Sequence, residues 1–179
     1  SGNRLLVGGN FTTIGSGATL RSRLARLNSD GSVDTAFFQG ANQRVAALAQ
    51  QSDGRVLVGG SFTQLAGASR TGLGRLNPDG SLDAEFNPVV AGTLNGALPS
   101  VEAVLWLADR RILIGGNFSS VNNQSSAGAA RLNYDGTRDG SFTPGANGVV
   151  HALAVAADGR FYLGGEFSRL GAETRPDRK

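Results

Sequence analysis

Three arginine–aspartate pairs recur at one spacing along the chain and are its first candidates for chemistry. The pairs are Arg26 with Asp34, Arg75 with Asp83, and Arg131 with Asp139, each eight residues apart with an Asp-Gly turn between the partners. Arginine and aspartate in register across a hairpin form a cross-strand or inter-sheet ion pair held by charge-assisted hydrogen bonds. We therefore expect these six residues to be structural.

The same turns suggest an alternative, a calcium site built from oxygen ligands. Asp30, Ser32 and Asp34 stand at positions i, i+2 and i+4, like the start of a calcium-binding loop. However, glycine occupies the second position and no distal glutamate follows, so the EF-hand pattern fails. We expect a structural turn without metal or other cofactor, and calcium is the alternative.

Further candidates are positions at which one copy of a repeated pattern departs from the others. Trp106 is the only tryptophan, and it lies close to Asp109-Arg110-Arg111 and to an unusually long stretch at 89–100. An exposed indole face can stack on a sugar ring, with Arg110 and Glu102 supplying hydrogen bonds. A buried Trp106 would only contribute packing.

His151 is the only histidine and fills the position that Ala46 and Glu102 hold in other copies. It has no cysteine or second histidine as a metal partner, and no G-x-S-x-G elbow is present for a catalytic triad. Glu102 and Glu166 can form an acid–base pair only if the fold brings them together. We expect no catalytic residue, and we take Trp106, Arg110, Glu102 and His151 as candidate ligand-binding residues.

The elements that position these residues come from a repeated phrase, R-hhh-G-G-x-F, in which h is apolar. It begins at Arg4, Arg55, Arg111 and Arg160, with steps of 51, 56 and 49 residues. Periods of this size are typical of solenoids, propellers or arrays. We divide a single repeat domain, 1–179, into units 4–54, 55–110 and 111–159 and a partial unit 160–179.

Each full unit contains three short apolar runs, of the forms hhh-G-G, A/G-R-L-N and V-x-A-L-A. Gly, Asp or Asn bounds these runs, which predicts strands, and Asp-Gly between two runs predicts antiparallel hairpins. Asp109-Arg110 departs from this pattern, so we expect a different or locally strained turn there. The paired glycines indicate crowding between neighbouring sheets or a sharp bend in the strand.

The three strands and a short fourth near Phe37, Phe86 and Phe142 would make about one propeller blade. Both faces of each strand are apolar, which suits a sheet packed between two others. The predicted fold is therefore all-β, a β-propeller-like stack of antiparallel sheets, with a β-trefoil as the alternative.

The combined pattern D-G-R-hhh-G-G-x-F, A-R-L-N-x-D-G-S-h-D-x-x-F and V-x-A-L-A resembles the bacterial delta sixty repeat, most clearly between Asp53 and Phe86. The departures are Asp109-Arg110, Thr137-Arg138-Asp139 and the stretch 89–100. The resemblance implies a secreted or surface-exposed bacterial protein used for binding, adhesion or assembly. It brings no catalytic residues with it.

Composition narrows the classes of partner. The net charge is only +3, and the pI of about 10.2 arises because almost every base is arginine. These arginines mostly recur at fixed places in the repeat, which favours structural pairing. A nucleic-acid binder usually gathers its charge on one face, so we expect no nucleic-acid binding. No run of eighteen apolar residues is present, which excludes a membrane-spanning helix. The absence of cysteine excludes disulfides.

The number of units bears on assembly. The chain enters the repeat in mid-phrase at Ser1-Gly2-Asn3-Arg4, without a signal peptide, and ends within a fourth unit, so we expect an excised segment or a removed leader. Propellers usually have four to eight blades, so neighbouring repeats or self-association would complete a ring.

The leading hypothesis is a non-enzymatic scaffold that binds an unknown protein or glycan. The alternatives are a carbohydrate-binding propeller using Trp106, and a hydrolase or lyase with its site across the blade tops.

Overall fold

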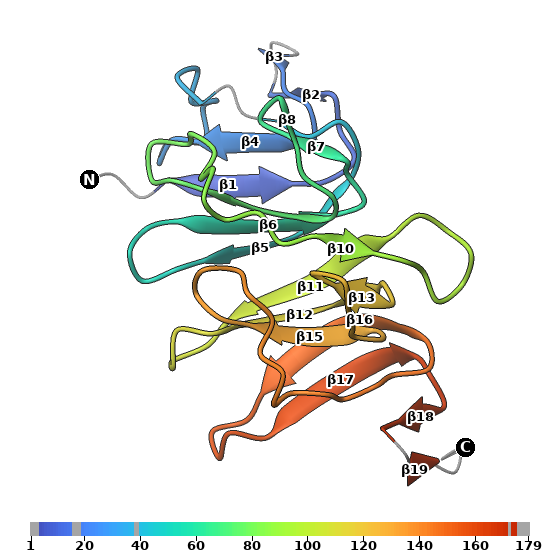
Figure 1. The fold of residues 1–179 in the computed structure, drawn as a ribbon. Helices are drawn as coiled ribbons and strands as arrows, with labels where there is room; N and C mark the ends of the chain where they lie inside the picture. The colour runs from blue at the N-terminus through green and yellow to red at the C-terminus, as the bar shows by residue number, and fades with distance from the viewer. Residues whose placement is uncertain (1–3, 16–18, 38–39, 172, 175–179) are drawn as a thin grey trace.

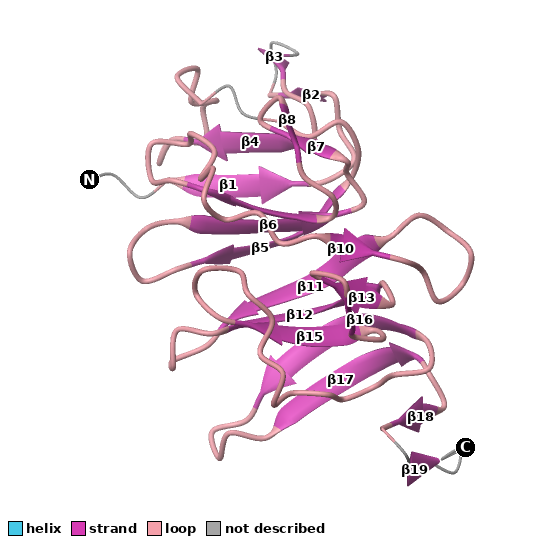
Figure 2. Ribbon diagram, in the orientation of Figure 1, coloured by secondary structure: helices cyan, strands magenta, loops and turns pink. Residues whose placement is uncertain are grey.

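The repeats fold into antiparallel sheets that are stacked one after another in chain order (Figure 1). The computed structural model describes residues 4–15, 19–37, 40–171 and 173–174. Within these residues every regular element is a strand, as Figure 2 shows. The stack matches the predicted β-propeller-like architecture rather than the trefoil alternative.

Four main sheets, which we call A to D, make up the stack. Sheet A consists of β1 (Leu5–Gly8) and β4 (Leu24–Leu27). Sheet B consists of β5 (Val45–Gln50), β6 (Val56–Gly60) and β9 (Leu73–Leu76). Sheet C consists of β11 (Ser100–Trp106), β12 (Ile112–Asn117) and β15 (Ala129–Leu132). Sheet D consists of β16 (Val149–Val155) and β17 (Phe161–Glu166).

The three repeated runs supply these strands in a fixed order. The V-x-A-L-A run is the first strand, the R-hhh-G-G run is the second and the R-L-N run is the third, and the second strand pairs with both others. Each first strand therefore comes from the sequence unit before the other two. The hairpins at the Asp-Gly turns, such as β5 with β6, confirm the predicted antiparallel pairing.

Short hairpins that the sequence analysis did not predict join the second strand to the third. They are β2 (Thr13–Ile14) with β3 (Thr19–Leu20), β7 (Gln64–Leu65) with β8 (Ala68–Ser69), and β13 (Ser120–Val121) with β14 (Gln124–Ser125). The last sheet is followed by β18 (Arg169–Leu170) with β19 (Glu173–Thr174), and β10 (Val90–Ala91) adds to β13. Strands of two residues are too short to show an apolar period.

The core lies between the sheets. Leu57 and Val58 are neighbours on β6 and both have 0% exposure, because Leu57 packs toward sheet C and Val58 packs toward sheet A. Successive strand residues point to opposite faces, so sheet B is covered on both sides. This accounts for the apolar character of both faces in the sequence.

The glycine pairs mark two kinds of close approach. A Cβ on Gly59 would lie 2.9 Å from the Val104 side chain of the next sheet. A Cβ on Gly60 would collide with the backbone carbonyl oxygen of Arg44, beside a bulge between Val45 and Ala47 in its own sheet. The predicted crowding of neighbouring sheets is therefore confirmed for the first glycine of the pair.

The predicted fourth strand near Phe37, Phe86 and Phe142 is wrong. Only single bridges form there among the described residues, between Leu27 and Val33, Leu76 and Leu82, and Leu132 and Arg138. Pairing stops because the aspartate that follows accepts a backbone hydrogen bond two residues on, as from Ala36 to Asp34, and turns the chain inward. Phe37 and Phe86 are consequently buried.

The described part of the chain contains no helix that would be long and apolar enough to pass through a membrane.

Candidate functional site

Trp106 ends β11, is partly buried and packs against the apolar cluster between sheets B and C. Its ring meets the Tyr134 ring edge-on, with centroids 6.0 Å apart. Tyr134 belongs to the turn after β15 and takes the place of Ser29 and Pro78 in the other repeats. The structure thus adds a second aromatic residue to the one that the sequence analysis singled out.

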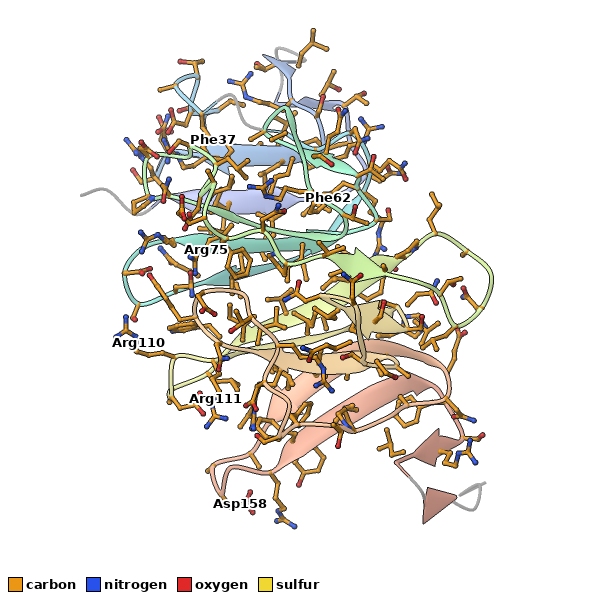
Figure 3. All side chains as sticks on the ribbon, in the orientation of Figure 1. Phe37, Phe62, Arg75, Arg110, Arg111 and Asp158 are labelled. Atoms are coloured by element: carbon orange, nitrogen blue, oxygen red, sulfur yellow. The ribbon has the colours of Figure 1, made fainter. Side chains whose placement is uncertain are left out.

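Arg110 joins this pair from the turn between β11 and β12. Its guanidinium carbon lies 5.1 Å from the centre of the Tyr134 ring. Arg110 keeps the hydrogen bonds of the Asp-Gly turns, since its backbone N–H donates to Leu107 as that of Gly54 donates to Gln51. However, its φ of 64° is in the left-handed region, so the predicted strain is present. Figure 3 shows Arg110 at the same edge of the stack as Arg75 and Arg111.

Charged groups complete this site from the side of sheet B. The Tyr134 hydroxyl donates to Asp53 Oδ2 at 2.6 Å. Arg55 Nη1 donates to the Tyr134 hydroxyl oxygen at 2.5 Å and to Asp53 Oδ2 at 2.8 Å. Desolvation opposes the charged form of Asp53, but the bonds from Tyr134 and Arg55 outweigh it and lower its pKa to about 2. The bond to Asp53 raises the pKa of Tyr134. We call Trp106, Tyr134, Arg110, Arg55 and Asp53 the rim cluster.

Glu102 and His151 lie elsewhere. Each is the extra residue of a β-bulge, between Val101 and Ala103 on β11 and between Val150 and Ala152 on β16. Bulges redirect side chains and recur beside functional sites. Glu102 precedes Trp106 by four residues along β11, about 13 Å of strand. The structure therefore separates Glu102 and His151 from Trp106 and Arg110.

The groups around Glu102 form a second polar cluster. Arg44 Nη1 and Ser100 Oγ each donate to a Glu102 carboxylate oxygen at 2.7 Å. Burial alone would raise the pKa of Glu102, but the hydrogen bonds from Arg44 and Ser100, together with the electrostatic effects of Arg44 and His151, lower it below its ordinary value. His151 Nε2 lies 3.2 Å from Glu166 Oε1 on the exposed surface. We call these five residues the bulge cluster.

The two partners of each repeated ion pair lie in contact, with the same geometry in all three repeats. The arginine Nε lies 2.8 Å from an aspartate oxygen in Arg26–Asp34, in Arg75–Asp83 and in Arg131–Asp139. Each guanidinium also covers the ring of the repeated phenylalanine, at 4.9 Å for Phe37, 4.3 Å for Phe86 and 5.0 Å for Phe142. Arg75 Nη1 further donates to the Tyr134 carbonyl oxygen at 2.6 Å, and so links sheet B to sheet C.

A known family accounts for this repeated unit. A model described as a domain of unknown function (DUF5122) beta-propeller matches residues 3–37, 51–86 and 107–142. The chain belongs to this β-propeller family. Each match ends at the phenylalanine under a repeated arginine, so the ion pair and the glycine pair are parts of the family unit. No curated protein matches this β-propeller chain.

The turn that suggested calcium has a local structural role in the propeller. Asp30 Oδ1 accepts hydrogen bonds from the backbone N–H and the hydroxyl of Ser32, at 2.9 and 2.6 Å. Asp34 faces Arg26 instead of Asp30. Among the described residues, no three histidine or acidic side chains come together as a metal-binding group would require.

Proposed function

We propose that this chain is a non-enzymatic propeller scaffold of a secreted or surface-exposed bacterial protein, with binding and assembly as its tasks. The resemblance to the delta sixty repeat supports the location and the bacterial source. The family assignment supports the scaffold, because propellers present variable loops on a constant framework.

One observation carries the binding half of this proposal. The residues shared by all repeats contact one another, as Arg75 does with Asp83 and Phe86. Two of the residues that break the repeat, Trp106 and Tyr134, meet each other, and Arg110 joins them in a strained conformation. The repeated Arg55 and Asp53 bond to the Tyr134 hydroxyl and hold it in place. Strained backbone concentrates at functional sites.

Arg110→Gly provides the test of binding at the rim cluster. It restores the Asp-Gly turn of the other sheets and removes the Arg110 side chain with its guanidinium. The labelled chain is applied to whole bacterial cells and to arrayed glycans and proteins, beside this variant. We expect retention on a ligand that weakens in the variant. Equal retention of both proteins would contradict a role for the rim cluster, and no retention on any surface would contradict binding altogether.

Carbohydrate is the second candidate ligand, because the edge of the stack combines an indole, a phenol and charged groups. Sugars stack on aromatic faces, accept hydrogen bonds from arginine and donate hydroxyl hydrogen bonds to aspartate, and Arg110, Arg55 and Asp53 all contact Tyr134. We expect Trp106→Ala to abolish glycan retention while Gln50→Ala, at the equivalent position of sheet B, preserves it. A glycan bound equally by both variants would exclude the indole.

A hydrolase or lyase is the least favoured reading of the bulge cluster. A general acid needs a raised pKa, whereas Arg44 and Ser100 hold the pKa of Glu102 below its usual value. Incubation with polysaccharides tests this alternative. Release of products that stops in Glu102→Gln or Glu166→Gln would make the protein an enzyme and overturn the proposal.

A further inference from the structure

A groove of about 740 Å³ runs between sheets A and B. Its apolar lining comes from both sheets and the loops beside them: Leu5, Leu6 and Phe37 on the side of sheet A, and Leu48, Val56, Leu76 and Pro78 on the side of sheet B. Arg4, Arg26, Gln50 and Asn77 add polar groups to the lining. Leu6, the β1 residue that packs toward sheet B, is only partly buried, although the equivalent Leu57 and Leu113 of sheets B and C are fully buried. The groove therefore exposes apolar surface that the neighbouring interface covers.

The edge of β1 beside this groove has no strand partner among the described residues. β1 pairs only with β4, whereas β6 pairs with β5 as well as β9, and β12 pairs with β11 as well as β15. In sheets B, C and D a first strand lies along this edge of the second strand. Exposed strand edges are templates for pairing with another segment.

The interface between sheets B and C shows what fills the equivalent space. There β5 lies along β6, and Ala47 and Ala49 pack against the apolar cluster shared with sheet C. Leu48 points the other way, toward sheet A. An occupant of the groove must therefore be an extended segment with small residues at alternate positions, as in V-x-A-x-A.

The surroundings of Gly9 also indicate room for a first strand beside β1. A Cβ on the equivalent Gly60, Gly116 or Gly165 would collide with a backbone carbonyl oxygen at the start of the first strand or just before it. A Cβ on Gly9 would meet only the Phe11 ring, at 3.1 Å. Gly9 thus keeps the clearance for a first-strand carbonyl that the described residues do not provide.

We propose that the free edge of β1 and the adjoining groove bind an added antiparallel β-strand of the V-x-A-x-A type, supplied by a repeat outside this 179-residue chain. The inference deepens the assembly half of the proposed function and is independent of the rim cluster. A second copy of the chain is a poor source. Its β5, β11 and β16 already pair with their own second strands, and donation would break those sheets.

A synthetic peptide of residues 44–51, which contains β5, is the probe. It is capped, fluorescently labelled and titrated with the chain, and fluorescence anisotropy reports binding. We expect saturable binding with one peptide per chain. The same peptide with proline in place of Ala47 is the control, and it should bind about tenfold more weakly or worse, because proline removes a backbone donor and resists pairing.

Gly9→Ala is the decisive protein variant. It should keep the thermal midpoint of the parent chain, since only the Phe11 ring has to shift, and it should weaken peptide binding about tenfold or more. Gly60→Ala is the matched control and should lower the thermal midpoint, because the carbonyl of Arg44 is already in place. Trp106→Ala should bind the peptide like the parent, which separates this test from that of the rim cluster.

Three outcomes would overturn the inference. The first is that the peptide fails to bind the parent chain. The second is that Gly9→Ala binds it as tightly as the parent does. The third is that sedimentation shows a dimer of the parent chain that Gly9→Ala abolishes, which would assign the groove to a second copy.

Discussion

At the scale of single residues, Arg110 occupies a conformation that costs about 1 kcal/mol for a residue with a Cβ. We expect Arg110→Gly to retain the full stability of the chain although it removes a large side chain. The reverse change, Gly159→Arg, introduces the strain at an equivalent turn where a Cβ meets no neighbour, and should destabilise the fold by about 1 kcal/mol. Denaturant unfolding measures both. If Arg110→Gly proves clearly destabilising, the contact with Tyr134 is structural and the functional interpretation of the strain fails.

The lowered pKa of Asp53 predicts that the free energy of unfolding depends on pH in the acidic range. Its folded pKa of about 2 is below the ordinary value of 3.8, so its contribution is complete above pH 3.8 and is lost as the pH falls toward 2. Asp53→Asn should therefore reduce stability at neutral pH and flatten the acid limb of a plot of unfolding free energy against pH. Asp109→Asn, at the equivalent turn where Arg111 is the bonded partner, is the control. An unchanged acid limb in Asp53→Asn would show that the bond from Tyr134 does not act as described.

The sequence predicted some residue contacts and missed others for a physical reason. The partners of Arg75–Asp83 are joined by one short turn, so a constant spacing reveals their contact. Tyr134 contacts Arg55 and Asp53, about eighty residues earlier, only because sheet C is stacked on sheet B. The only sign of this contact in the sequence was that Tyr134 replaces the Ser29 and Pro78 of the other repeats.

At the scale of elements, the glycine pair sets how closely the sheets approach. A Cβ on Gly115 would lie 2.8 Å from Val150 and 3.3 Å from Leu153 of sheet D. Gly115→Ala should therefore destabilise the chain by about 1–3 kcal/mol through overpacking. Gly164→Ala is the matched control on the outermost sheet, because its Cβ meets only Ala152, at 3.7 Å, and its cost should be within about 0.5 kcal/mol. Equal costs measured by denaturant unfolding would refute this account of the sheet spacing.

The elements also show which strands a sequence pattern can predict and which it cannot. Runs of four to seven residues bounded by turns identified the main strands, such as β5 and β12. The hairpin of β7 and β8 has two residues in each strand, and Ala66 and Gly67 turn the chain with positive φ. Alanine gives no warning of such a turn, so the hairpin was not predicted. The fourth strand failed because its aspartates cap a turn rather than continue the pairing.

At the scale of the whole molecule, the stack makes stability a sum of sheets and of the interfaces between them. Sheets B and C are covered on both faces, and every residue of β6 and β12 is buried. β1 and β17 belong to sheets A and D, at opposite ends of the stack in Figure 1, and no residue in either strand is fully buried. The number of covered faces, rather than the sequence of the strand, should therefore decide how readily a strand opens.

Hydrogen exchange tests this gradient, because amides open with free energies that follow local burial. We expect peptides covering β6 and β12 to exchange most slowly, and those covering β1 and β17 to exchange at least about tenfold faster. The β5 peptide should slow exchange in β1 and leave β17 unchanged, because β1 lines the groove and β17 belongs to sheet D. Uniform protection from β1 to β17 would mean that the sheets open as one cooperative unit. In that case the interfaces between sheets, not the coverage of each sheet, would set the stability of the chain.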